Sequence, residues 1–428
     1  MKSFTFLIVL AAVLFSACGK TANTPGASAM LVSQAGYDAA EPAIAAGVNN
    51  DIFVAYVAHP SKDGADVFVR KFGADGQPAG DAVQVNPASG SAKAWFGDPP
   101  TIKIGADGAI YVGWTAAIPG GNDLFLSVSH DQGKSFDVPV KVNDDTLPAA
   151  HGMHSLAVDA NGRVYLAWLD ERNVKHEEKT VLASNGVQPA DGYHFEMAHH
   201  TEGASHPEQP QQQHKMESEP NSEVFLAVSS DGGKTFSANK RLATEVCPCC
   251  KTSLAVAPDG RVYVSWRQVL ENGCRHIAVT STADGGATFS DEVIVSDDKW
   301  KIYACPVSGA AMSAGENNAL NIAWYTAGDA GQPGLYTAES SDGGKTFSQR
   351  NLLSNEVTGG TPVLLDDQDH QYFVFAAKKT VEIKGANSPG VQKIENAERP
   401  AAAVSNGKLF IAFVRKIGDT QTIQLAML

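Results

Sequence analysis

Five cysteines in the second half of the chain have the residue type and spacing to bind a soft metal ion. Three lie in the segment Cys247-Pro-Cys249-Cys250, and the other two are Cys274 and Cys305. Side chains alternate along an extended chain, so we expect Cys247 and Cys249 on one side and Cys250 on the other. Two sulfurs of this segment, joined by Cys305, would form a thiolate site of the kind that copper(I) prefers.

Histidine and methionine extend the candidate ligand set. His151-Gly-Met153-His154 precedes a predicted strand, and His276 stands two residues after Cys274. Thiolate, imidazole and thioether together suit copper, whereas methionine adds nothing for zinc. The predicted metal ligands are Cys247, Cys249, Cys250, Cys274, Cys305, His151, Met153, His154 and His276. Copper is the cofactor that the pattern favours, zinc remains possible, and no catalytic residue is assigned.

Two other interpretations of the cysteines remain open. In an oxidising compartment, five cysteines can form two disulfides with one left over. Cys247 or Cys249 would then pair with Cys305, and Cys250 with Cys274. A thiol–disulfide exchange site is the third interpretation, because adjacent cysteines can exchange partners. A strand, however, lacks the helix N-terminus that usually lowers the pKa of a reactive thiol.

A long insertion at 171–221 is rich in the same kinds of ligand. Its composition is typical of a flexible arm that gathers metal ions. Its histidines and methionines are His176, His194, Met197, His199, His200, His206, His214 and Met216.

Four copies of one short pattern define the architecture. Each copy runs Ser/Thr-x-Asp-x-Gly-x-Ser/Thr-Phe, and the aspartates are Asp131, Asp231, Asp284 and Asp342. The aspartate can accept backbone hydrogen bonds across a turn, the glycine supplies a positive φ, and the phenylalanine packs beneath. The pattern resembles the Asp-box, or BNR repeat, of sialidases and related β-propellers. That resemblance implies a structural turn and does not imply an activity.

Alternating apolar segments between these turns predict an all-β fold. Three or four such segments recur in each of seven units, and the seventh unit ends after its third strand. Residues 30–33 supply a candidate for the missing fourth strand, which would close the ring and remove its open edges. We therefore predict a single seven-bladed β-propeller over 29–428. Six blades with an irregular appendage is the alternative.

The propeller topology explains why distant ligands should meet. The first strand of each blade lines the central channel, and the loops that enter it open on the same face as the loops between the second and third strands. By this rule the five cysteines and ten of the twelve histidines share one face, opposite the Asp-boxes. The expected site is therefore the channel mouth of blades three to five.

Further motifs suggest a subgroup of the same family. Three segments of the chain resemble a group of bacterial proteins labelled sialidase-like for their repeats. These segments are Cys247-Pro-Cys-Cys250-Lys-Thr-Ser-Leu, Ala304-Cys305-Pro306 and His151-Gly-Met-His154-Ser-Leu. The resemblance implies exo-α-sialidase-like hydrolysis as an alternative function. Such enzymes use three arginines with a tyrosine nucleophile, a glutamate and an aspartate. The strand ends that could contribute to such an active site carry Arg172, Arg267, Arg415 and Asp170. Salt bridges at the rim of the propeller explain these residues better.

The amino terminus predicts export and a lipid anchor. Lys2 precedes an apolar run, and Ser16-Ala17 precede Cys18, an order that resembles a lipobox. Residues 1–17 would form the signal peptide, Cys18 the lipidation site, and 18–28 a flexible tether. Glycine after the lipidated cysteine implies the outer membrane, with the protein facing the periplasm or the cell surface.

The net charge of the chain limits the classes of partner that it could bind. A formal net charge of −14 argues against nucleic acid. We expect a monomer whose partner is an envelope protein or a metal-delivery protein. A non-catalytic protein- or glycan-binding scaffold with structural disulfides is the alternative to metal handling.

Overall fold

The structure, a computed structural model, describes residues 29–61, 64–93, 96–174, 221–302, 306–357, 359–367, 370–386 and 390–428. The predicted signal peptide, Cys18, Cys305 and the histidines and methionines of the insertion lie outside these ranges. Among the described residues, no helix has the length and hydropathy that crossing a bilayer requires.

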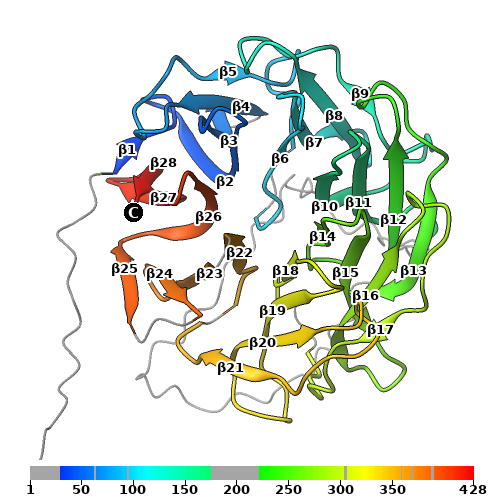
Figure 1. The fold of residues 1–428 in the computed structure, drawn as a ribbon. Helices are drawn as coiled ribbons and strands as arrows, with labels where there is room; N and C mark the ends of the chain where they lie inside the picture. The colour runs from blue at the N-terminus through cyan, green and yellow to red at the C-terminus, as the bar shows by residue number, and fades with distance from the viewer. Residues whose placement is uncertain are drawn as a thin grey trace, which may run out of the picture.

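The described chain is all-β and forms seven units of four antiparallel strands around a central axis (Figure 1). The seven blades, in chain order, are β2(Asp38–Ala46)–β3(Ile52–Ser61)–β4(Gly64–Phe72)–β5(Val83–Gln84); β6(Thr101–Ile104)–β7(Ile110–Ile118)–β8(Gly121–Ser129)–β9(Val140–Lys141); β10(His151–Val158)–β11(Val164–Asp170)–β12(Ser222–Ser229)–β13(Lys240–Val246); β14(Ser253–Val256)–β15(Val262–Val269)–β16(Arg275–Thr282)–β17(Val293–Ile294); β18(Ala310–Ala314)–β19(Leu320–Thr326)–β20(Gly334–Ser340)–β21(Asn351–Ser354); β22(Val363–Asp367)–β23(His370–Ala377)–β24(Thr380–Gly385)–β25(Val391–Glu395); and β26(Glu398–Ser405)–β27(Lys408–Ile417)–β28(Thr420–Met427)–β1(Met30–Leu31). The predicted seven-blade propeller is confirmed.

Two features join the blades. The amino-terminal strand β1 pairs with β28 through Met30 and Leu425, so the first strand of the chain completes the last blade, as predicted. The third and fourth blades share one continuous sheet, because β13 pairs with β15 at Val246 and Gln268. The cysteine segment begins directly after this pair.

A large aromatic side chain recurs at one position of the second strand and fills the space between blades. In four blades this residue is a tryptophan, and each of these four tryptophans is at most 4% exposed. Each indole N–H donates a hydrogen bond to a nearby side chain, which satisfies the one polar atom of the ring. The tryptophans with this core role are Trp114, Trp168, Trp266 and Trp324.

The Asp-box turns connect the third and fourth strands of their blades. In the second copy, Asp231 Oδ1 accepts hydrogen bonds from the backbone N–H of Lys234 and Thr235, and Oδ2 accepts one from the Thr235 hydroxyl at 2.6 Å. These hydrogen bonds, the Thr235 hydroxyl first, lower the pKa of Asp231 to about 2. Phe236 packs against the core between blades. The turn is therefore a structural device, as the repeat predicts.

We expect Asp231→Ala to lower the free energy of unfolding by about 1 kcal/mol, the usual cost of removing a side-chain acceptor for backbone N–H groups. The pKa of Asp231 is lowered on folding, so its contribution is present above the ordinary value of 3.8 and is lost as the pH falls through about 2. Denaturant unfolding at pH 7 and at pH 2 would measure this. A matched control is Asp419→Ala, in the exposed turn between β27 and β28. Equal losses in the two variants at pH 7 would contradict the expectation.

Candidate metal and thiol site

The cysteine segment crosses from the outer edge of blade three to the inner strand of blade four. Cys247 follows β13, and its backbone N–H donates to the carbonyl oxygen of Arg267 on β15 at 2.9 Å. The chain then turns and runs inward to β14. Cys247 and Cys250 are fully buried, and Cys249 is 8% exposed. The three cysteines therefore lie inside the junction of two blades, and Cys249 is the most exposed of them.

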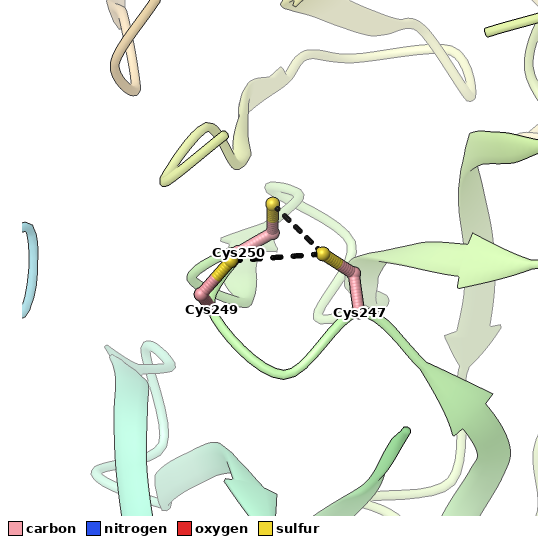
Figure 2. Close-up of side chains that lie close together, drawn as sticks. All are labelled: Cys247, Cys249 and Cys250. Carbon is pink, nitrogen blue, oxygen red and sulfur yellow. Dashed lines mark hydrogen bonds between the residues drawn. The ribbon is translucent and has the colours of Figure 1, made fainter. Parts of the chain in front are cut away.

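The turn brings all three sulfurs together (Figure 2). Cys247 Sγ lies 3.4 Å from Cys250 Sγ and 3.9 Å from Cys249 Sγ, and the three Sγ atoms lie within 4.8 Å of one another. The expected alternation, with Cys250 on the opposite side, is wrong. It assumed an extended chain, whereas residues 248–250 form a turn that rotates Cys250 back toward Cys247.

The cysteines differ in oxidation state. Cys249 is disulfide-bonded, whereas Cys247, Cys250 and Cys274 are free thiols. The predicted Cys250–Cys274 disulfide is therefore absent. Cys250 faces Cys247 instead, and the backbone of Cys274 pairs with Lys301 in a separate bridge. Cys305, the other predicted disulfide partner, lies outside the described residues.

Two arginines create a positive environment around Cys247. Arg275 Nη1 lies 3.1 Å from Cys247 Sγ, and the charge of Arg267 acts in the same direction. The hydrogen bond with Cys250, followed by these charges, outweighs burial and lowers the pKa of Cys247 to about 6. Burial and the neighbouring Cys247 raise the pKa of Cys250. The pair therefore shares one negative charge at neutral pH, held mainly on Cys247.

No motif in the sequence points to Arg275 as part of this site. It begins β16 and pairs with Val269 of β15, and this register places its guanidinium beside a sulfur 28 residues earlier in the chain. Its position directly after Cys274 was the one signal that could have suggested a role.

His151 lies in a different cluster, with Asp145 and Asp170. Its Nδ1 is 2.7 Å from the carbonyl oxygen of Asn122, and its Nε2 is 2.9 Å from Asp145 Oδ2. Arg172 Nη2 lies 3.0 Å from Asp145 Oδ2 and 2.9 Å from Asp170 Oδ2. The guanidinium contacts both carboxylates and offsets part of their charge, so this cluster is an ion-pair network centred on Arg172.

The remaining predicted ligands also have neighbours of their own. Met153 packs against the core between blades three and four. His154 Nδ1 lies 3.4 Å from Asp98 Oδ1, and Asp98 Oδ1 lies 3.7 Å from Lys251 Nζ. His276 Nε2 lies 3.7 Å from Asp297 Oδ1. Of the eight predicted ligands that the structure describes, the cysteine cluster contains three, and a ligand role for the others and for Cys305 stays a prediction.

The charged residues considered for glycoside hydrolysis have structural partners. Arg172 and Asp170 form the ion pair described above, as expected. Arg415 Nη1 donates to Gln424 Oε1 at 2.7 Å. Arg267 differs from the expected rim position, because it is fully buried and donates to the carbonyl oxygens of Ser308 and Tyr325.

Comparison with known proteins supports the fold and leaves the activity open. No protein-family model matches the chain, and no curated protein matches it. Among solved structures, the polysaccharide lyase Uly1 is 10% identical, with 90% of this chain and 89% of that chain covered and a TM-score of 0.51. A Dyadobacter fermentans protein of unknown function is 14% identical over 94% and 99% of the two chains, with a TM-score of 0.49. The K499G mutant of NanB sialidase from Streptococcus pneumoniae is 12% identical over 88% and 83%, with a TM-score of 0.48. The likeness to Uly1 concerns the fold alone.

Proposed function

We propose that this protein binds a soft metal ion, copper(I) first, through the reduced sulfurs of Cys247, Cys249 and Cys250. The observation that carries the proposal is the convergence of three buried Sγ atoms within 4.8 Å. Thiolates are soft ligands and select copper(I) over harder ions. No other part of the described chain gathers three cysteine sulfurs in this way.

The charges around the cluster support a monovalent metal ion. Three thiolates and one copper(I) ion together carry a charge of −2. The guanidinium of Arg275, in contact with Cys247, and the buried guanidinium of Arg267 compensate for that charge. Without such cations a buried anionic cluster is costly. The surrounding residues therefore fit a thiolate-bound copper(I) ion.

Loading requires reduction of Cys249, because a disulfide-bonded sulfur is not a thiolate ligand. The reduced chain offers three thiolates at one place, whereas the oxidised chain offers two. We therefore expect binding to depend on the redox state of the sample.

The proposed role is one in an exported protein. We propose that Cys18 anchors the chain to the outer membrane and that the histidine- and methionine-rich insertion delivers metal to the propeller. A metal-delivery protein of the envelope is the proposed partner. Glycoside hydrolysis is not part of the proposal, since Arg172, Arg267 and Arg415 are engaged in structural bonds.

The test is a competition titration of the reduced, full-length chain against a chromophoric copper(I) chelator. We expect one copper(I) ion per chain that resists the chelator. Cys247→Ser and Cys250→Ser should each weaken binding at the cluster by at least about tenfold, because each removes a thiolate ligand.

Cys274→Ser is the matched control, because Cys274 is also free and buried but lies outside the cluster. Its affinity should equal that of the wild type. If all three serine variants bound copper(I) as tightly as the wild type, the metal would sit elsewhere and the proposal would fail.

A further inference from the structure

We propose that Cys247 and the disulfide-bonded Cys249 form a thiol–disulfide exchange pair, in which the Cys247 sulfur attacks Cys249 Sγ and takes over its disulfide bond. This activity needs no metal and is separate from copper binding, although it uses the same sulfurs. It would act on mixed disulfides between Cys249 and small thiols.

The first support is the placement of a free thiol beside a disulfide. Cys247 is free, Cys249 is disulfide-bonded, and their Sγ atoms lie 3.9 Å apart. Exchange begins when a thiolate approaches a disulfide sulfur in this manner. Figure 2 shows both side chains directed toward one another across the turn.

The second support is the surroundings of the attacking sulfur. Arg275 Nη1 contacts Cys247 Sγ at 3.1 Å, and Cys250 shares a hydrogen bond with it at 3.4 Å. The guanidinium lies against the attacking sulfur, where it would offset the negative charge of the nucleophile during exchange. Cys250 and Arg275 are thus positioning residues, and Cys247 is the nucleophile.

The third support is the difference in access. Cys249 is 8% exposed, whereas Cys247 and Cys250 are fully buried. A small thiol from solvent would therefore meet Cys249 first. The buried Cys247 is placed to displace that thiol afterwards, as a resolving cysteine does.

The steps balance without an added oxidant. A small thiolate attacks Cys249 Sγ, forms a mixed disulfide and releases the original partner of Cys249 as a thiolate. The Cys247 thiolate then attacks Cys249 Sγ, forms the Cys247–Cys249 disulfide and expels the small thiolate. Each leaving thiolate takes up a proton from water. One disulfide is present before and after, so no net oxidation occurs.

The test treats the unreduced, full-length chain with glutathione in the presence of a metal chelator. Samples are quenched in acid, and the disulfides are mapped by mass spectrometry. In the wild type we expect the Cys247–Cys249 disulfide to form and the glutathione adduct of Cys249 to remain scarce. In Cys247→Ser the adduct should accumulate by about tenfold or more, because the resolving thiol is gone.

Cys274→Ser is again the control, and it should behave as the wild type. Absence of any Cys247–Cys249 disulfide in the wild type would overturn the proposal, and this reading does not depend on whether the variant folds. Equal adduct levels in Cys247→Ser and the wild type would overturn it as well. The assay is metal-free, so a Cys247–Cys249 disulfide in a chain that fails to bind copper(I) would leave exchange intact and reject only the metal site.

Discussion

The Arg267→Ala variant is expected to unfold with a free energy about 4 kcal/mol lower than that of the wild type. Arg267 is fully buried, its guanidinium donates to the carbonyl oxygens of Ser308 and Tyr325, and it lies 4.8 Å from the Trp300 ring. Its removal leaves two buried acceptors without their donor, at about 1–3 kcal/mol each, and also loses a desolvated cation–π contact. Denaturant unfolding at pH 7 measures the change.

Arg415→Ala is the comparison, because Arg415 lies toward solvent on the last blade, over the Phe413 ring at 4.9 Å. Partly exposed charges contribute little, so we expect a loss below about 1 kcal/mol. If Arg267→Ala were as stable as Arg415→Ala, Arg267 would not be holding blades four and five together. Arg267 would then be available for another role.

The Arg275→Gln variant is expected to bind copper(I) about 10–100-fold more weakly at pH 7, which is the usual effect of removing a group that supports a metal ligand. The contact with Arg275 helps to hold the pKa of Cys247 at about 6, well below its ordinary value of 9.0. Without the guanidinium the pKa rises, and the metal must displace a proton at neutral pH. The measurement is a chelator competition of the reduced chain between pH 5 and pH 9.

The pH profile separates this electrostatic effect from a general loss of structure. Cys250 has a raised pKa in the wild type, so both proteins should gain affinity as the pH rises. Removal of the guanidinium raises the pKa of Cys247 alone, so the difference in affinity should be widest near neutral pH and should narrow toward pH 9, where Cys247 of the variant also loses its proton. Arg241→Gln is the control, because Arg241 of β13 is half exposed and pairs with Glu223 of β12. A variant profile parallel to that of the wild type would argue against the contact with Cys247.

The structural Asp-box turns and the cysteine segment lie in different connections of the chain. The Asp-boxes connect third and fourth strands, whereas the cysteine segment connects blade three to the inner strand of blade four. A change at Asp231 should therefore alter stability alone, and a change at Cys247 should alter thiol chemistry. This separation allows each substitution to be interpreted by one measurement.

The sequence by itself determined the architecture. Period-two apolar segments, four Asp-boxes and a recurring tryptophan are local patterns, and each predicts its own strand, turn or core position. The closing strand at Met30–Leu31 was predictable because the last unit lacked a fourth strand. These features depend on neighbours in the chain, so the chain order was enough to identify them.

Only the tertiary structure decided the site. The turn at 248–250 interrupts the alternation of side chains that an extended chain would have, and it brings Cys250 to Cys247. The pairing of Arg275 with Val269 places a cation beside the Cys247 thiol. His151, which seemed a suitable ligand, instead lies 2.9 Å from Asp145, and His154 lies 3.4 Å from Asp98. Burial of a polar side chain is costly without a partner, and the neighbours of these histidines are set by strand register and blade packing, which the order of residues does not show.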